Sequence, residues 1–476
     1  MNDAARASRL TDELIDRFAA IVGREHALTD PEQQLPYLRE WRDMYAGRAS
    51  VVLRPATTQQ VAQILALANA HGVPVVPQAG NTGLVGGQVP MGGEVLLSVS
   101  RLQRVRAVDP AGYTMTVEAG LTLAEAQAAA DRVDRLFPLS LPSEGSCRIG
   151  GNLAINAGGV SVLAYGNARQ LVLGLEVVLA DGRIWDGLRG LKKDNTGYDL
   201  KDLFIGSEGT LGVITAAVLK LFPKPAEKAT AFVALPDIGA ALPLFTLAQE
   251  AAGQSLTAYE VMAGIVLDLV LKHTPGTRDP FAARHPWYAL VETSGLKADG
   301  AAERVLTEVL TAAAGRGLVR DAVIAGSLAQ ARELWRLRES YSPAQKPEGG
   351  NIKNDVSVPV ASIPELMARA DREVARRCPG ARPVPLAHFG DGSVHYNIAQ
   401  PPGMAKEKFL ALWDDITQAV QAIVLDLGGS ISAEHGIGQM KRADLARAKS
   451  AVEMDMMRRI KAALDPKGIL NPGKVL

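Results

Sequence analysis

The sequence predicts an α+β protein with two mixed domains followed by a helical C-terminal segment. Between Val51 and Asp181, β-rich runs alternate with amphipathic helical patterns. The segment FPKPAEK, which begins at Phe222, places two prolines and two lysines between apolar runs, as an interdomain linker does. The chain has 476 residues, and a domain takes roughly 150. We therefore expect domains at 1–226 and 227–412 and a helical segment at 413–476.

The first domain begins with a strand–helix–strand pattern. VVLRP and VPVVPQ have the composition of strands, and TTQQVAQILALANAHG between them has a helical pattern. Thr57 or Thr58 is the expected N-cap, and Gly72 is the expected end of this helix. EVLLSVS and TMTVEAG follow as strands, TLAEAQAAADRV as a helix opened by Thr122, and LGLEVVLADGRIWD as a hairpin.

The second domain combines strands with long amphipathic helices. ATAFVAL and WYALVETSG are the predicted strands, and GAAERVLTEVLTAAAGRG is a predicted helix. The last segment is mainly helical, with the runs EKFLALWDDITQAVQAIVLDLGG and RADLARAKSAVEMDMMRRIKAALD. We expect a second α+β domain that the C-terminal helices complete.

Composition excludes several classes of protein. Lys plus Arg and Asp plus Glu both number 51, so no overall charge attracts nucleic acid or an anionic membrane. MNDAARASRLTDELIDRF has no signal-peptide pattern, and no run approaches the ~20 apolar residues of a membrane span, so we expect a cytoplasmic protein. Cys147 and Cys378 are too few for an iron–sulfur cluster and are expected to be buried small side chains.

Two glycine-rich loops indicate a nucleotide site in the first domain. PQAGNTGLVGG, residues 77–87, directly follows a predicted strand, and IGGNLAINAGG, residues 149–159, forms the second loop. Glycine lets the backbone approach an anion closely and present its N–H groups. Neither G-x-G-x-x-G nor G-x-x-x-x-G-K-[ST] occurs, so the pattern favours neither a Rossmann nor a P-loop site.

These loops, together with LKKDNTGYDLKDLFIGSEGTLGVIT at residues 191–215, resemble the FAD-binding domain of the vanillyl-alcohol oxidase (PCMH-type) flavoproteins. The resemblance implies a two-subdomain FAD-binding domain. Some members bind flavin covalently through His or Cys, but no histidine lies between His71 and His273, which predicts non-covalent FAD. The residues implied to contact FAD are Gly80, Asn81, Thr82, Gly83, Leu84, Gly150, Gly151, Asn156, Gly158, Gly159, Ile214 and Asn471.

Three of the seven histidines fall in short polar motifs near the C-terminal end. In AHFGDGSVHYNIA, Asp391-Gly392 predicts a two-residue hairpin turn that pairs His388 with His395. Opposed side chains lie about 5 Å apart at Cβ, so two imidazoles could share one metal ion. Glu434, in SISAEHGIGQMKR, offers a carboxylate that suits zinc or a similar divalent ion. The alternative is a polar hairpin with solvated histidines, and spacing alone does not show that the two segments meet.

Basic residues near this hairpin suggest a carboxylate site. WRLRESYS places Arg338 and Ser342 four apart, on one face of a helix expected to end near Pro343. In the alternating run IKNDVSV, Lys353 and Asp355 are expected on one strand face. An arginine fork suits a carboxylate and a lysine adds a point charge, although surface charges on a solvated helix would show the same pattern.

From about residue 50 onward the chain resembles the FAD-linked D-2-hydroxy acid dehydrogenases, and among them the family of D-2-hydroxyglutarate dehydrogenases. The resemblance implies a divalent metal, usually zinc, on His388, His395 and Glu434. It also implies His435 as general base, with hydride passing from substrate C2 to flavin N5. The implied substrate contacts are Arg338, Ser342, Lys353, Asn397 and His388.

The expected substrate is D-2-hydroxyglutarate, with D-malate as a second candidate, because Lys353 adds a cation to Arg338. The resemblance implies electron-transfer flavoprotein as electron acceptor, and analogy suggests a homodimer. A D-lactate or glycolate dehydrogenase of the same family remains an alternative. Two alternatives from other classes are a zinc hydrolase and a non-catalytic flavin-binding subunit.

Overall fold

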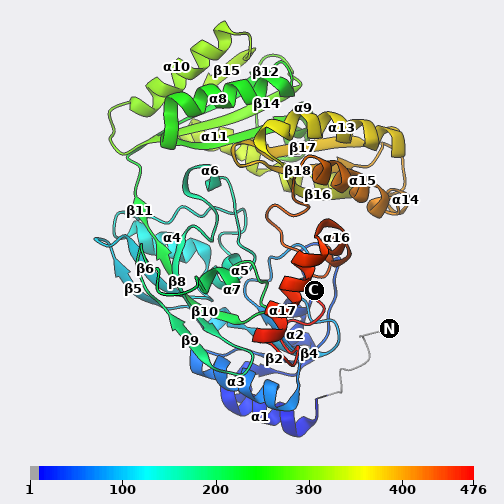
Figure 1. Cartoon of the computed structure of the whole chain (residues 1–476). Helices are drawn as coiled ribbons and strands as arrows, with labels where there is room; N and C mark the ends of the chain where they lie inside the picture. The colour runs from blue at the N-terminus through cyan, green and yellow to red at the C-terminus, as the bar shows by residue number, and fades with distance from the viewer. Residues whose placement is uncertain (1–9) are drawn as a thin grey trace. The chain divides into compact units, whose positions relative to one another are not determined.

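The computed structural model describes residues 10–476, so the first nine residues of the N-terminal stretch considered above lie outside it. Two compact units divide the chain. Unit 1 comprises the residues up to Gly158, Gly166–Pro223 and His435–Leu476, and unit 2 comprises Gly159–Tyr165 and Lys224–Glu434. Each unit has its own sheets and helices (Figure 1). In the part that the structure describes, none of the helices has the length and apolar character to cross a membrane.

In its described residues, unit 1 contains two principal sheets. The first is mixed, with the order β1-β2-β4-β3; β2, β4 and β3 run parallel and β1 antiparallel. The second is antiparallel, with the order β5-β6-β10-β8-β9, and β11 and β7 form a small separate pair. The strand bounds are β1 Ala27–Leu28, β2 Ala49–Leu53, β3 Val75–Gln78, β4 Glu94–Ser98, β5 Val105–Asp109, β6 Thr114–Glu118, β7 Arg135–Leu136, β8 Val172–Val178, β9 Ile184–Gly187, β10 Val213–Lys220 and β11 Phe222–Pro223.

Two helices of unit 1, α3 and α4, begin at the caps that the sequence predicts. Thr57 caps α3 by accepting from the Gln60 N–H, and Gly72 ends it in the left-handed conformation at φ +64°. Thr122 and Glu125 form a capping box at α4. The helix bounds are α1 Asp12–Val22, α2 Pro31–Leu38, α3 Thr58–His71, α4 Leu123–Asp131, α5 Ile149–Ala154, α7 Lys201–Phe204, α16 Arg442–Ala448 and α17 Ala451–Leu464.

Unit 2 is built on an antiparallel seven-stranded sheet with the order β15-β12-β14-β13-β17-β18-β16. Apolar side chains of α8, α10, α13 and α15 form a core with one face of the sheet, and those of α9, α11 and α12 cover the other face. The strand bounds are β12 Glu227–Leu235, β13 Leu256–Ala263, β14 Trp287–Gly295, β15 Asp321–Ile324, β16 Asn351–Ser357, β17 Arg382–His388 and β18 Ser393–Ala399. The helix bounds are α6 Val162–Tyr165, α8 Ala241–Ala252, α9 Gly264–His273, α10 Ala301–Gly315, α11 Leu328–Glu339, α12 Tyr341–Gln345, α13 Ile363–Arg377, α14 Lys406–Leu410 and α15 Trp413–Asp426.

The compact units differ from the expected domains at the C-terminal end. They join between Pro223 and Lys224, inside the FPKPAEK segment, but residues 413–476 do not form one helical part. Helix α15 belongs to unit 2 because its apolar face packs on α13 and β16. Helix α17 belongs to unit 1, where Lys461 donates to the carbonyls of Thr210 and Leu470. The chain therefore returns to unit 1 at residue 435.

Candidate active site

The two glycine-rich loops pack against each other in unit 1. A Cβ on Gly80 would lie 2.3 Å from the carbonyl oxygen of Ser146, and one on Gly151 would lie 3.0 Å from Cβ of Ala79. Backbone thus fills the space that a side chain at Gly80 would need. The contact explains why the first loop needs glycine where it meets the chain that precedes α5.

The first loop presents unused backbone donors. Within residues 10–476, none of the N–H groups from Asn81 to Gln88 donates a hydrogen bond. Asn81 adopts φ +54°, and its side-chain amide donates to the carbonyls of Pro36 and Arg39 at 2.9 and 2.7 Å. These contacts fix the loop while leaving its amides available. Such a row of amides can bind the phosphate oxygens of a dinucleotide.

Asn471 joins the C-terminal segment to this loop. Its backbone N–H donates to Val75, and its side-chain amide donates to the carbonyls of Gly87 and Glu208 at 3.0 and 2.7 Å. Its Oδ1 atom is buried and has no hydrogen-bond partner in the described part of the chain. A buried acceptor without a donor is rare in a folded protein, so this atom fits a ligand that donates to it. The loop and Asn471 together fit FAD.

The other residues predicted to contact FAD are spread over both units. Gly150 packs on Ala119, and Asn156 accepts from the Arg169 N–H at 2.9 Å. Ile214 lies on β10, whereas Gly159 begins the short segment that belongs to unit 2. Unit 1 therefore contains the Gly80–Leu84 loop, Gly150, Gly151 and Asn471, whereas Gly159 belongs to unit 2.

In unit 2, the predicted hairpin is present but its predicted register is wrong. His388 pairs with Ser393 instead of His395, because four residues, Phe389–Gly392, connect β17 and β18. Phe389–Asp391 form a turn of 3₁₀ helix, and Gly392 completes the connection at φ +86°. The two histidines are therefore diagonal neighbours, which still lie on the same face of the sheet. Their ring centroids are 5.4 Å apart.

A carboxylate from the C-terminal end of unit 2 completes a cluster with the two histidines. His388 Nε2 lies 3.2 Å from Glu434 Oε1, and His395 Nε2 lies 3.7 Å from Glu434 Oε2. On the other side of each ring, Nδ1 of His388 lies 2.8 Å from Glu260, and Nδ1 of His395 lies 4.0 Å from Asp355. His388, His395 and Glu434 each offer one ligand atom, and these three atoms lie within 4.8 Å of one another. This donor set, with carboxylates behind both imidazoles, fits a divalent ion such as zinc.

Asp355 explains why Glu434 reaches the hairpin. Its carboxylate accepts from the Glu434 N–H at 3.2 to 3.3 Å, and Ser430 forms a β-bridge with Ser357 at the end of β16. The sequence did not reveal that these segments meet. The structure shows that the edge strand of the sheet holds them together.

The cluster is electrostatically coupled. Burial alone would lower the pKa of His388, but the carboxylates of Glu260 and Glu434 outweigh it and raise this pKa to about 9. Burial raises the pKa of Glu434 to about 7. Burial also acts to raise the pKa of Glu260, yet Arg338 and His388 reverse the effect and lower it. Without a metal ion the cluster therefore retains protons near neutral pH.

Arg338 lies beside this cluster, in the last turn of α11. Its side chain is buried, and Nε and Nη2 both lie 2.7 Å from Glu260 Oε2. Nη2 also lies 3.1 Å from His388 Nε2. Nη1 makes no hydrogen bond or ion pair within residues 10–476, so it remains available to a ligand.

Ser342 does not share a helix with Arg338, so this expectation was wrong. Helix α11 ends at Glu339, and Ser342 lies half-buried in α12. Pro343 has no N–H to donate to the carbonyl of Glu339, four residues earlier. The helical hydrogen bonding is therefore interrupted at Glu339, where α11 ends, and not at Pro343 as expected.

Lys353 and Asn397 extend the same sheet face. They are cross-strand partners on β16 and β18, and Asn397 donates to Gln345 Oε1 at 3.2 Å. The expectation that Lys353 and Asp355 share a strand face is confirmed by β16. This face of the sheet therefore carries Lys353, Asn397 and the two histidines, and Arg338 of α11 and Glu434 contact it at His388.

His435 follows Glu434 directly in the chain and is the first residue of the last segment of unit 1. The next residues are held by Glu208, whose carboxylate accepts from the N–H groups of Ile437 and Gly438 at 2.7 and 2.8 Å. Glu208 itself adopts φ +53° and is buried. It therefore fixes the loop that begins at His435.

Glu208 and Glu260 were missed by the reasoning from sequence. Glu260 is the sole charged residue in LTAYEVMA, the sequence of β13, and it is 1% exposed. A lone carboxylate inside an apolar strand needs a buried partner, and that signal could have identified it. Glu208 lies in the GSEGTLG stretch of residues 206–212, where no such contrast is present.

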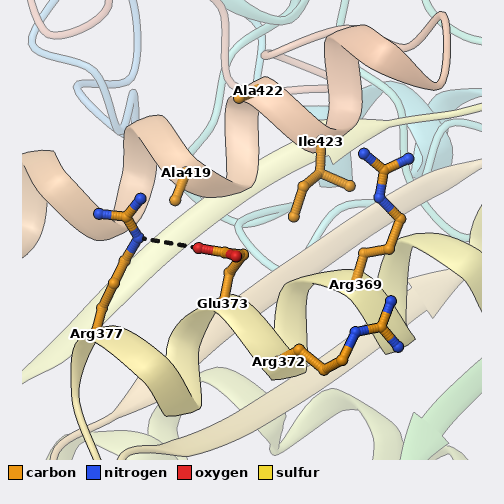
Figure 2. Close-up of a pocket in the computed structure, with 7 residues that line it drawn as sticks. All are labelled: Arg369, Arg372, Glu373, Arg377, Ala419, Ala422 and Ile423. Carbon is orange, nitrogen blue, oxygen red and sulfur yellow. Dashed lines mark ion pairs between the residues drawn. The ribbon is translucent and has the colours of Figure 1, made fainter.

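A separate groove in unit 2 lies between α13 and α15, on the opposite face of the sheet from His388. Arg369, Arg372 and Arg377 line it, and Figure 2 shows Arg377 paired with Glu373. Arg369 pairs with Glu365 and Asp426. None of the predicted site residues lines this groove, so we do not assign the active site to it.

Comparison with protein families agrees with this geometry. A model described as "FAD binding domain" matches residues 49–187, and one described as "FAD linked oxidases, C-terminal domain" matches residues 224–475, more than half of the chain. The chain is 38% identical to a mitochondrial D-2-hydroxyglutarate dehydrogenase of Arabidopsis thaliana over 98% of its length and 82% of the relative. The corresponding values are 40%, 98% and 86% for the mitochondrial D-2-hydroxyglutarate dehydrogenase of Rattus norvegicus. They are 36%, 98% and 97% for a D-2-hydroxyglutarate dehydrogenase of Xanthomonas citri pv. viticola.

The chain belongs to the D-2-hydroxyglutarate dehydrogenase family. It is an FAD-dependent oxidoreductase, as the sequence predicted. This family assignment argues against a zinc hydrolase, which would leave the FAD-binding domain without a role.

Solved structures agree with the α+β fold and the PCMH-type FAD-binding domain. An alkyldihydroxyacetonephosphate synthase superposes with a TM-score of 0.76 at 17% identity, covering 98% of this chain and 86% of the other. A substrate-bound p-cresol methylhydroxylase also gives 0.76, at 18% identity and with coverages of 97% and 96%. At these identities the likeness shows the fold alone, and the fold prediction is confirmed.

Proposed function

We propose that this protein oxidises D-2-hydroxyglutarate to 2-oxoglutarate and transfers the two electrons to non-covalently bound FAD. D-malate is proposed as a second substrate. The observation that carries the proposal is the face of the unit 2 sheet, where Arg338 and Lys353 accompany the cluster of His388, His395 and Glu434. Two cations suit a dicarboxylate, and the names of the curated relatives agree with this substrate.

The chain's own residues divide the work of binding. Nη1 of Arg338 is the free donor for the C1 carboxylate of the substrate. Lys353, with Asn397 and Ser342, would bind the distal carboxylate or assist at C1. His435 would accept the proton of the 2-hydroxyl, which an imidazole can do near neutral pH.

The residues that would hold the cofactors are distinct. His388, His395 and Glu434 would hold a divalent ion, which we propose to be zinc, and His388 would also contact the substrate. The glycine-rich loops and Asn471 would hold FAD. When bound, FAD supplies the hydride acceptor and the divalent ion supplies Lewis acidity beside the hydroxyl.

Three expectations stay predictions. Electron-transfer flavoprotein is the proposed acceptor, because family resemblance favours it. The homodimer rests on analogy. The cytoplasmic location is also a prediction, and several relatives are named as mitochondrial.

An anaerobic absorbance titration tests the substrate and the stereochemistry together. The purified protein is titrated with D- and L-2-hydroxyglutarate, D-malate, D-lactate and glycolate, before and after treatment with a chelator. We expect D-2-hydroxyglutarate to bleach the flavin band at about 450 nm and the L-enantiomer to leave it unchanged. Preferential bleaching by D-lactate or glycolate would reassign the substrate. A yellow protein that no hydroxy acid bleaches would refute the proposed reaction.

A further inference from the structure

Glu260 occupies an unusual position in the sheet of unit 2. It is a fully buried carboxylate on β13 and the cross-strand partner of His388 on β17. A buried carboxylate destabilises the fold unless its oxygens are paired. The role of Glu260 therefore follows from the side chains that its two oxygens bind.

The two oxygens of Glu260 bind different groups. Oε2 receives both Nε and Nη2 of Arg338 at 2.7 Å, and Oε1 lies 2.8 Å from Nδ1 of His388. One rigid carboxylate thus joins the proposed substrate anchor to a proposed metal ligand. In the described part of the chain, no other residue binds both Arg338 and His388 through separate side-chain oxygens.

Each contact has a geometric consequence. An ionised carboxylate can only accept, so the contact keeps a proton on Nδ1 of His388 and directs Nε2 toward Glu434 as the metal-binding nitrogen. On Arg338, Glu260 occupies Nε and Nη2, which leaves Nη1 for a ligand. Removing the carboxylate would release both groups together.

We propose that Glu260 is a positioning residue that fixes the distance and orientation between the substrate-anchoring guanidinium of Arg338 and the metal-binding imidazole of His388. The proposal rests on the proposed function of this site. It implies that a single change at Glu260 weakens metal binding and substrate binding together, although Glu260 is not expected to touch either ligand.

The substitution Glu260→Gln tests this, because a carboxamide has one acceptor oxygen and cannot serve both partners. The matched control is Glu292→Gln. Glu292 is also buried, lies on the adjacent strand β14, and binds Lys228, Thr230, Thr257 and Trp335 instead of site residues. Zn²⁺ affinity is measured on the FAD-loaded full chain by competition with a chelator, without turnover. KM and kcat for D-2-hydroxyglutarate are measured with a dye acceptor.

We expect Glu260→Gln to weaken Zn²⁺ binding about 10- to 100-fold and to raise KM more than it lowers kcat. Glu292→Gln should lower the melting temperature without changing the Zn²⁺ affinity or KM. If Glu260→Gln does not fold, Glu260→Asp, which keeps the charge but shortens the reach, should show the same paired loss. Wild-type Zn²⁺ affinity and KM in a folded Glu260 variant would overturn the inference, and so would equal losses in Glu292→Gln. A wild-type protein that oxidises D-2-hydroxyglutarate but binds no divalent ion would overturn the positioning role alone. One that binds Zn²⁺ but oxidises no hydroxy acid would refute the proposed function.

Discussion

Replacing Arg338 tests whether the buried guanidinium is the substrate anchor. In Arg338→Met the two contacts to Glu260 disappear, and a carboxylate whose side chain is 2% exposed loses its arginine partner and keeps only His388 as a cationic neighbour. Breaking a buried ion pair in this way costs about 3–5 kcal/mol in the free energy of unfolding. Loss of a charge-assisted hydrogen bond from Nη1 to the substrate costs about 1.5–3 kcal/mol, which corresponds to a rise in KM of about 10- to 150-fold.

The assay combines thermal unfolding with initial rates in a dye-linked reaction, and the FAD content of each variant is measured first. Arg338→Lys keeps the charge but not the planar fork, so it should retain more stability than Arg338→Met while still raising KM. Arg336→Met is the matched control, because Arg336 lies on the same helix, is exposed, and donates from its side chain to the carbonyls of Pro275 and Gly276 instead of site residues. A folded Arg338 variant with the wild-type KM would refute the assignment of the anchor.

The remaining predictions concern the metal ion and FAD. The pKa of His388 is raised to about 9 and that of Glu434 to about 7, so both side chains are protonated below these values and a divalent ion must displace the protons to bind. The affinity for the divalent ion should therefore rise about tenfold per pH unit from pH 7 to 9, and more steeply with pH below pH 7. A flat profile in chelator titrations would contradict this. Gly80→Ala should lower the amount of FAD retained after purification, because its Cβ would meet the carbonyl of Ser146. The control Gly145→Ala should retain FAD as the wild type does, because the space around its Cβ is open. Equal retention of FAD in the two variants would exclude the first loop from the FAD site. Acid precipitation should release all of the FAD into the supernatant, and flavin remaining with the precipitate would show a covalent link.

The sequence by itself determined the features that depend on neighbouring residues. Thr57 and Gly72 mark the ends of α3 because caps act within one turn of the chain. The alternation of Lys353 and Asp355 with apolar residues placed both on one face of β16, since a strand repeats every two residues. The glycine-rich loops and the longer family motifs indicated FAD, and both cysteines are buried as expected.

Tertiary structure decided the features that depend on distant residues. The sequence placed His388 opposite His395, but a four-residue connection shifts the register so that His388 pairs with Ser393. The two histidines still lie close together, because diagonal neighbours are on the same face of the sheet. The division of the C-terminal helices followed from the apolar faces available to each helix in its own unit, which no local pattern contains. Glu260 reaches Arg338 and His388 across 78 and 128 residues of sequence. Such contacts depend on strand order and register, so the sequence supplied the functional groups and the folded sheet of unit 2 determined which of them meet.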